Sequence, residues 1–232
     1  MTRHTPRMSA ERAERIRIWH EAAYETAKRE GASGQTFDYL GRTIVVPPEV
    51  QPIAGMSRLL GEAVLTEVHA GDRVLDMGTG SGVNAILAAS TATSVLAVDI
   101  SPHAIAAAEA NAVRNGVADV IEVRQSDVFA NVAGEFDLII FDPPFRWFAP
   151  RDALEAATAD EDYRAMTSFF ENAKQHLSDN GRMLIFFGTS GDLDYLEHLF
   201  VLHGFSANVV AHQGLSKDGL AVDYFTYRCE PL

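Results

Sequence analysis

The segment 73–83, which reads RVLDMGTGSGV, constrains the fold of this chain more than any other stretch. A short apolar run ends at Asp76 and is followed by glycines at alternate positions, Gly78, Gly80 and Gly82. This pattern predicts a buried strand that leads into a backbone-lined binding loop and a helix, because glycine permits tight turns and lets a ligand contact the main chain. A dinucleotide-binding fingerprint, G-x-G-x-x-G, would need a third glycine at position 83, where the chain has valine.

The chain from residue 73 onward alternates strand and helix patterns, and this alternation predicts the fold class. Strands are expected at 73–77, 94–99, 120–125, 136–141 and 182–187, and helices near 81–90, 102–115, 162–177 and 192–203. Repeated strand–helix units of this length predict an α/β fold with a mostly parallel sheet and helices on both of its faces. Two further strands near 206–212 and 224–229 have no helix between them, so they predict a terminal hairpin that places one antiparallel strand in a seven-stranded sheet.

The first 70 residues predict a helix, a hairpin and a second helix, which we treat as a substrate-side cap on a ligand-binding domain at 71–232. Ser9 is a suitable cap for a helix that ends near Gly31. The residues through Gly31 carry a net charge of +2, whereas the remainder of the chain carries −15. This helix either presents a solvated face, or docks over the substrate side or against a partner. The hairpin is expected at 37–39 and 43–46, and the second helix at 56–68.

Charge and composition argue against several classes of function. The formal net charge of −13 disfavours an extended nucleic-acid groove, because such grooves depend on clustered Lys and Arg. No apolar run approaches the roughly 20 residues of a membrane span, and the single cysteine, Cys229, can form no internal disulfide. These features predict a cytoplasmic protein that does not enter a membrane. The eight histidines lack metal-ligand spacing, so no metal site is predicted, and oligomeric state cannot be predicted.

Acidic residues follow four predicted strands, each at the point where the strand ends. Asp76 closes the first strand, Asp99 the second, Asp127 follows the third and Asp142 closes the fourth. One acid at such a position would suit a turn, whereas acids at successive carboxyl ends beside the glycine loop indicate a binding site at that edge of the sheet. Asp99 follows the loop by about twenty residues, where an acid can accept hydrogen bonds from both ribose hydroxyls. A helix cap or a turn is the alternative role for Asp99.

The tetrapeptide Asp142-Pro143-Pro144-Phe145, directly after the strand 136–141, indicates a site for a planar NH2 group. Two consecutive prolines hold the chain extended, and Pro144 has no amide hydrogen, so the carbonyls of this turn are free to accept hydrogen bonds from another group. Asp142 and the Pro143 carbonyl are expected to accept the two NH2 hydrogens, while Phe145 stacks on the plane of the group. Such a device would act mainly by orienting the nitrogen.

These motifs together resemble those of class I methyltransferases that use S-adenosylmethionine (SAM). The glycine loop has the form D-x-G-x-G-x-G of their SAM-binding loop, and the tetrapeptide resembles the (Asp/Asn)-Pro-Pro-(Tyr/Phe) box of enzymes that methylate amide or ring-attached nitrogens. The segments 98–101 (VDIS) and 136–140 (FDLII) are similar to those of release-factor glutamine methyltransferases and small-domain ribosomal RNA guanine methyltransferases. The resemblance covers roughly residues 73–229. The glutamine-modifying enzymes usually carry Asn and Tyr where this chain has Asp142 and Phe145.

The resemblance implies roles for the residues of the predicted site. SAM would be bound and S-adenosylhomocysteine released, with the backbone of the glycine loop facing the amino-acid part and ribose of the ligand. Asp127 corresponds to the position that accepts a hydrogen bond from the adenine amine, and Val128 to the residue that packs on the ring. The expected cofactor-binding residues are Asp76, Gly78, Thr79, Gly80, Gly82, Asp99, Ile100, Asp127 and Val128, and the expected catalytic residues are Asp142, Pro143 and Phe145.

The methyl acceptor is less constrained than the reaction. The resemblance implies transfer to an amide or amine nitrogen, with a protein glutamine as one acceptor and a small molecule or an rRNA guanine as alternatives. The sequence Asp-Pro-Pro-Phe-Arg is closer to some RNA guanine N2-methyltransferases, but the acidity of the chain favours a protein or a small molecule over RNA. Two alternatives to a methyltransferase are an NAD-dependent oxidoreductase and a catalytically silent SAM-binding subunit. Val83 and the box argue against the oxidoreductase.

The segment 146–162 after the box is long, irregular and rich in acids. Trp147 and Phe148 are expected either to line the acceptor pocket or to form an apolar patch at the sheet edge. The acids of this segment are expected to face solvent rather than to select a cationic acceptor; they are Asp152, Glu155, Asp160, Glu161 and Asp162.

Overall fold

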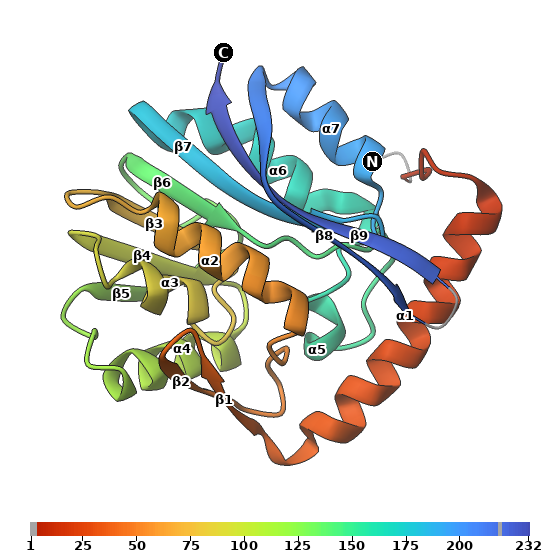
Figure 1. Ribbon diagram of the computed structural model, residues 1–232, viewed down its shortest axis with the longest axis horizontal. Coiled ribbons are helices and arrows are strands. Elements are labelled where there is room, and N and C mark those ends of the chain that lie inside the picture. Colours follow the sequence, from red (N-terminus) through yellow and green to blue (C-terminus); the bar gives the residue numbers. More distant parts are fainter. Residues whose placement is uncertain (1–3, 218–219) are drawn as a thin grey trace.

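A sheet of seven strands in the order β5-β4-β3-β6-β7-β9-β8 forms the centre of the molecule (Figure 1). The computed structural model describes residues 4–217 and 220–232. The strands are β3 (Arg73–Met77), β4 (Ser94–Asp99), β5 (Ile121–Gln125), β6 (Phe136–Phe141), β7 (Leu177–Gly188), β8 (Phe205–Lys217) and β9 (Leu220–Pro231). In the described part of this sheet, β9 alone runs opposite to the other six strands. The predicted α/β class and the antiparallel terminal strand are confirmed.

Helices cover both faces of the sheet (Figure 1). One face carries α2 (Arg58–Glu67), α3 (Val83–Ala88) and α4 (Pro102–Arg114), and the other carries α6 (Arg164–Asn172) and α7 (Leu193–Leu202). The middle strands are mostly apolar because both of their faces are covered, and Leu138, Ile139 and Ile140 of β6 are fully buried. The shorter elements are α5 (Ala153–Ala156), η1 (Gly31–Ser33), η2 (Gly55–Ser57), η3 (Glu161–Tyr163) and η4 (Ala173–His176).

The N-terminal part forms the predicted helix and hairpin and packs on the edge of the sheet that carries the predicted site. The helix α1 (Ala10–Glu30) begins after Ser9, whose Oγ accepts a hydrogen bond from the Arg12 amide at 3.2 Å. It runs along one side of the molecule, from the hairpin toward the ends of β8 and β9 (Figure 1). The hairpin strands β1 (Gln35–Tyr39) and β2 (Arg42–Val46) form a separate two-stranded sheet. Asn111 of α4 fastens that sheet, because its Oδ1 accepts from the Val45 amide at 2.9 Å.

The helix predicted at 162–177 is shorter and is interrupted at both ends. Asp162 and Tyr163 have φ values of 56° and 53°, so the regular helix α6 begins only at Arg164. The carboxylate of Asp160 caps this start, because it accepts hydrogen bonds from the amides of Ala165 at 2.9 Å and of Met166 at 3.1 Å. The last turn of the predicted helix is the separate η4. The capping acid lies before two non-helical residues, which is why the sequence pattern placed the boundary too early.

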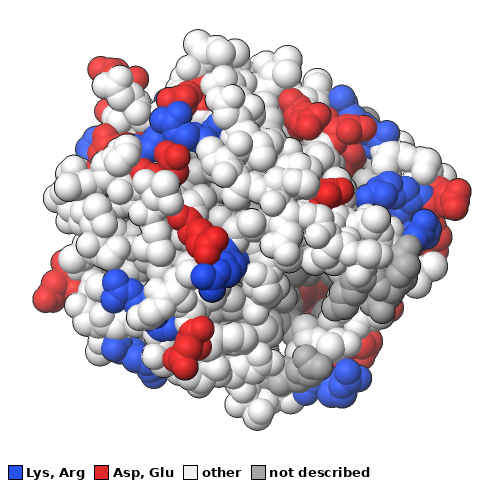
Figure 2. Space-filling view, viewed as in Figure 1, with Lys and Arg blue, Asp and Glu red and all other residues white. Residues whose placement is uncertain are grey.

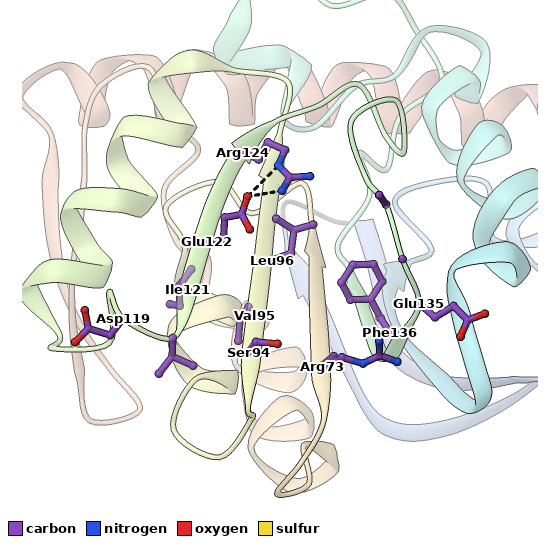
Figure 3. Close-up of a pocket in the computed structure, with 13 residues that line it drawn as sticks. Arg73, Ser94, Val95, Leu96, Asp119, Ile121, Glu122, Arg124, Glu135 and Phe136 are labelled. Atoms are coloured by element: carbon purple, nitrogen blue, oxygen red, sulfur yellow. Dashed lines mark hydrogen bonds and ion pairs between the residues drawn. The ribbon is translucent and has the colours of Figure 1, made fainter.

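The connection between β5 and β6 contains no regular helix in the described chain, and this leaves part of the sheet open. A groove of about 450 Å³ lies there, with Arg73, Ser94 and Phe136 along it (Figure 3). These three residues begin β3, β4 and β6, so the groove lies at the amino ends of the strands. The predicted site lies at the opposite, carboxyl ends, and the two are therefore separate.

Candidate active site

Three loops that carry predicted site residues meet at the carboxyl edge of the sheet because their strands are neighbours. β3 lies between β4 and β6, with Met77 paired to both Val98 and Phe141. The glycine loop therefore emerges between Asp99, which ends β4, and Asp142, which follows β6. This pairing places the glycine loop next to the Asp-Pro-Pro-Phe box, although the two are far apart in the sequence.

Glycine is needed at the three loop positions for different structural reasons. Gly78, Gly80 and Gly82 all have positive φ, of 69°, 54° and 84°, which side chains rarely adopt. A Cβ atom at Gly78 or Gly80 would meet no atom within 4 Å, whereas one at Gly82 would lie 3.0 Å from the Cα of Ala108. Gly82 thus allows α4 to pack closely on the loop. Gly78 and Gly80 leave their backbone open to a ligand.

Asp76 and Thr79 hold the shape of the glycine loop from inside. The Asp76 Oδ2 atom accepts hydrogen bonds from the Thr79 hydroxyl at 2.6 Å and from the Ala85 amide at 3.1 Å. Both side chains are buried. Burial raises the pKa of Asp76 to about 6, against the effect of these two hydrogen bonds. Asp76 and Thr79 lie at the predicted site, but their side chains point into the protein.

Asp99 connects the glycine loop to the end of β4. Its Oδ2 atom accepts from the Gly80 amide and its Oδ1 atom from the Ser101 amide, both at 2.9 Å. The side chain is partly exposed, and its burial raises the pKa of the carboxyl group. Each oxygen has a second lone pair, so the carboxylate can still accept from a pair of hydroxyls. The next residue, Ile100, leaves an apolar side chain 56% exposed at this edge.

Asp127 and Val128 lie at the end of β5, on the far side of β4 from the glycine loop. Val128 has a φ of 49° and packs partly against the core. The Asp127 carboxylate is exposed and accepts a hydrogen bond from the Arg164 guanidinium at 3.2 Å. Exposed ion pairs of this kind contribute little free energy, so a ligand amine could replace Arg164. The sequence did not predict that Arg164 contacts Asp127.

The Asp-Pro-Pro-Phe box has a rigid end and an open end. The Phe145 ring is buried against Phe187, with 4.7 Å between ring centroids, and the Phe145 carbonyl accepts from the Tyr163 hydroxyl at 2.6 Å. Asp142 is only partly buried, and its carboxylate forms no hydrogen bond with a described residue. Burial, and secondarily the charge of Asp76, raises the pKa of Asp142 to about 7. A half-buried carboxylate without a partner is available to a ligand.

Two polar residues that the sequence analysis missed lie near Asp142. The Tyr39 hydroxyl, from the hairpin, is buried and has no hydrogen-bond partner in the described chain. Burial and then the nearby charge of Asp142 raise the pKa of Tyr39. Arg146, the residue after the box, is buried as well, and its charge lowers the pKa of Asp142. Arg146 was adjacent to the box in the sequence, but no sequence signal pointed to Tyr39.

The segment after the box is fixed against α1 rather than free. Trp147 is buried, and the Arg17 guanidinium of α1 lies 5.0 Å from the centre of the Phe148 ring. Glu155 is buried and accepts from His20 of α1 at 2.9 Å, although the donor depends on the tautomer. Hydrogen bonds from Arg151 lower the pKa of Glu155 to about 2.

The prediction that the acids of this segment face solvent is wrong for two of them. Glu155 is buried because His20 and Arg151 pair with it, and Asp160 is buried because it caps α6. Arg151 lies only four positions from Glu155, but His20, its partner from α1, lies 135 positions away and could not be inferred from local sequence. These two acids therefore stabilise the fold.

The strand order, the glycine loop after β3 and the box after β6 together define a class I methyltransferase fold. The family described as "Methyltransferase small domain" matches residues 54–209. The chain belongs to this family of SAM-dependent methyltransferases. This result confirms the sequence-based resemblance and removes support for the NAD-dependent oxidoreductase alternative.

Curated relatives carry more specific names. The chain is 38% identical over 145 residues to a release factor glutamine methyltransferase of Cereibacter sphaeroides, covering 56% of this chain and 50% of that protein. It is 36% identical over 115 residues to a ribosomal RNA small subunit methyltransferase C of Haemophilus influenzae, covering 49% and 31% of the two chains. The match thus spans half or less of the length of each of these relatives.

Solved structures confirm the fold. The ribosomal protein L11 methylase of Lactobacillus delbrueckii subsp. bulgaricus superposes with a TM-score of 0.59 at 22% identity, covering 80% of this chain and 83% of that one. Methanocaldococcus jannaschii Trm5 in complex with adenosine superposes with a TM-score of 0.64 at 17% identity, covering 86% and 56%. At these identities the likeness concerns the fold alone.

The described residues also limit the kinds of site that this protein can contain. Within residues 4–217 and 220–232, no group of three or more His, Cys, Asp or Glu side chains is arranged to hold a metal ion. No helix in the same ranges combines the length and apolar character needed to cross a bilayer.

Proposed function

We propose that this protein transfers a methyl group from SAM to an amide or amine nitrogen. The observation that carries the proposal is the pairing of β3 with β6, which places the open backbone of the glycine loop beside the unpartnered carboxylate of Asp142. A donor on the loop and an acceptor at Asp142 would then be neighbours. The box is characteristic of transfer to nitrogen, and the family supplies the reaction class.

The residues at the carboxyl edge fit SAM as the methyl donor. The open backbone at Gly78 and Gly80 suits its amino-acid part, and the spare lone pairs of Asp99 suit its ribose hydroxyls. The exposed Ile100 and the neighbouring Val128 offer apolar surface to the adenine, with Asp127 near its amine. When bound, SAM supplies a methyl group on a positively charged sulfur and leaves as S-adenosylhomocysteine. Asp76 and Thr79 would contribute indirectly, by holding the loop.

The box would orient the acceptor and receive its proton. Asp142 and the Pro143 carbonyl would accept the two hydrogens of the NH2 group, which directs the nitrogen lone pair at the methyl carbon. As the nitrogen–carbon bond forms and the sulfur–carbon bond breaks, the nitrogen gives up one proton. Asp142, with a pKa of about 7, can accept that proton near neutral pH. Phe145, which is 7% exposed, would border the acceptor from the core side.

The acceptor that we propose is a protein side chain or a small molecule. The net charge of −13 opposes binding to a nucleic acid, and Figure 2 shows basic and acidic side chains intermixed, without a continuous basic area on that face. A protein glutamine would agree with the name of one relative, and an rRNA guanine with that of another. The intermixed charge favours a protein glutamine over an rRNA guanine.

The N-terminal part, residues 1–70, would cover the acceptor side of the site. Trp19 of α1 lies against Arg146, and Tyr39 of the hairpin lies near Asp142, so both elements border the space in front of the box. The single cysteine agrees with a cytoplasmic location, which stays a prediction from the sequence.

The proposal is tested by two measurements on the purified protein. Calorimetry should show that SAM and S-adenosylhomocysteine bind, whereas NAD does not. Incubation with methyl-labelled SAM and a cell lysate, followed by separation into protein, RNA and small-molecule fractions, should place the label in the protein or the small-molecule fraction, on nitrogen. Binding of NAD without binding of SAM, or label on oxygen or carbon, would refute the proposal.

A further inference from the structure

Arg146 is a buried cation whose guanidinium has no hydrogen-bond or ion-pair partner among the described residues. Its side chain is 8% exposed, and its Nε atom is sealed from solvent without a hydrogen bond. None of its guanidinium nitrogens forms a hydrogen bond or an ion pair with a residue in the described chain. Buried arginines are rare unless they are paired, because removing a charge from water is costly. The missing partner therefore needs an explanation.

A second buried arginine shows how this protein treats a structural guanidinium. Arg182 is 4% exposed, and it donates to the Asp72 carboxylate at 2.8 Å and to the Asp137 carbonyl at 2.9 Å. It also donates to the Glu67 carbonyl. Arg146 has a similar burial but none of these contacts. Packing alone thus does not account for Arg146.

Two aromatic rings determine which part of Arg146 is available. Its guanidinium carbon lies 5.1 Å from the centre of the Trp19 ring and 5.6 Å from that of the Phe145 ring. Aromatic rings offer no carboxylate or carbonyl oxygen, so these contacts leave the N–H groups of the guanidinium without acceptors. That edge is suited to a planar anion held by two parallel hydrogen bonds.

The position of Arg146 connects it to the acceptor. It follows the box directly in the chain, and its positive charge acts on Asp142. It does not approach any described carboxylate closely enough to form an ion pair. An anion that pairs with Arg146 would therefore be supplied by a ligand in the space in front of Asp142.

We infer that Arg146 binds a carboxylate of the methyl acceptor, which is a small molecule carrying that carboxylate beside the amide or amine nitrogen that is methylated. This inference rests on the proposed function and narrows its acceptor. A small molecule suits this position because the guanidinium is only 8% exposed and Trp19 of α1 lies against it, so only a compact group can reach it. A carboxylate matches the flat edge of the guanidinium and carries a single charge, which suits a site that also contains Asp142.

The binding of an anion at Arg146 can be measured without methyl transfer. Protein labelled with [15N]arginine and saturated with S-adenosylhomocysteine would be titrated at constant ionic strength with acetate, with the neutral acetamide and with inorganic phosphate. The Nε–H signal of Arg146, assigned by its loss in Arg146→Lys, should shift saturably with acetate and not with acetamide. Arg17, which contacts the same aromatic segment but is exposed, provides the control signal.

The other outcomes of this titration contradict the inference. The absence of a saturable shift with either anion would show that Arg146 holds no anion. A saturable shift that is stronger with phosphate than with acetate would replace the carboxylate by a phosphoryl group. A shift of the Arg17 signal in parallel with that of Arg146 would reveal a general salt effect.

Methyl transfer provides a second readout that separates this inference from the proposed function. With small molecules of a lysate fractionated by anion exchange, the labelled product should be an anion, and Arg146→Gln should lower kcat/KM for it roughly 10- to 100-fold, the loss of a charged hydrogen-bonded pair. Arg17→Gln should leave transfer unchanged, and S-adenosylhomocysteine should bind both variants with the wild-type affinity. If S-adenosylhomocysteine does not bind the wild type, the proposed function fails. If it binds but a neutral acceptor is methylated equally by wild type and Arg146→Gln, only the Arg146 inference fails.

Discussion

The two halves of the site differ in how their polar groups are satisfied. In the half assigned to the cofactor, Asp76 and Asp99 each accept two hydrogen bonds, from donors no more than 19 positions away in the chain. In the half assigned to the acceptor, the side chains of Asp142, Tyr39 and Arg146 form no hydrogen bond with a described residue. The cofactor half is thus built before a ligand arrives. The acceptor half keeps free the groups with which it would bind one.

This difference shows which ligand each half can select. Acids that already accept hydrogen bonds from the backbone fix the shape of a loop. A loop of fixed shape can bind any ligand with matching hydrogen-bond donors. Unpaired buried groups cost free energy in the absence of a ligand, so they favour a ligand that satisfies them and reject one that does not. The identity of the acceptor should therefore depend on Asp142, Tyr39 and Arg146.

The largest effect should come from removing the free carboxylate. Asp142→Ala should lower methyl transfer roughly 100- to 10,000-fold, because both the orientation of the nitrogen and the proton acceptor are lost. SAM affinity by calorimetry should stay close to that of the wild type. Asp137→Ala, which removes an acid at the other end of the same strand, should leave transfer unchanged. A wild-type rate of transfer in Asp142→Ala would show that the carboxylate has no role in the reaction. A wild-type protein that binds SAM but transfers no methyl group would indicate a catalytically silent subunit.

A smaller effect is expected in the cofactor half, on binding rather than on transfer. Asp99→Ala should weaken SAM binding roughly 10- to 100-fold, because hydrogen bonds to a charged group are lost from both the ribose and the loop. Calorimetry with SAM and S-adenosylhomocysteine should show the same loss for both, since they share the ribose. The exposed Asp119, in the turn before β5, provides the control variant Asp119→Ala. An unchanged affinity in Asp99→Ala would rule out the ribose assignment.

The same division explains how much could be predicted from the sequence. Every strand of the seven-stranded sheet was predicted, and so was the position of the glycine loop, because these features depend on local apolar patterns and on glycine. The roles of Tyr39 and Arg146 were not predicted, because they depend on the packing of the hairpin and of α1 against the box. Long-range packing leaves no periodic signal in one sequence. The acceptor half was therefore the less predictable half.

The pH dependence of methyl transfer should follow the ionisation of the Asp142 carboxyl group. Its pKa is raised to about 7 by burial, so the carboxylate that accepts a proton is lost as the pH falls below 7. We expect kcat/KM for the acceptor to rise with pH up to about 7 and to fall roughly tenfold for each unit below it. The positive charge of bound SAM acts to lower this midpoint, so a midpoint above 7 would contradict the assignment. Asp142→Asn should retain some transfer and lose the dependence on this group.

The smallest effect tests whether the cofactor half is as fully preformed as its hydrogen bonds indicate. Asp127 differs from Asp76 and Asp99 because its partner is a side chain from a helix, Arg164 of α6, and the pair is half exposed, with a distance of 3.2 Å. Arg164→Ala should therefore strengthen SAM binding by less than about fivefold, because the adenine amine no longer competes for the carboxylate. Asp127→Ala should change affinity in the opposite direction, and both effects should shrink at high salt. If Arg164→Ala instead weakens binding, Arg164 itself contacts the ligand. Asp127 would then serve to hold the arginine, and the adenine would have to be recognised by the apolar surface of Ile100 and Val128 alone.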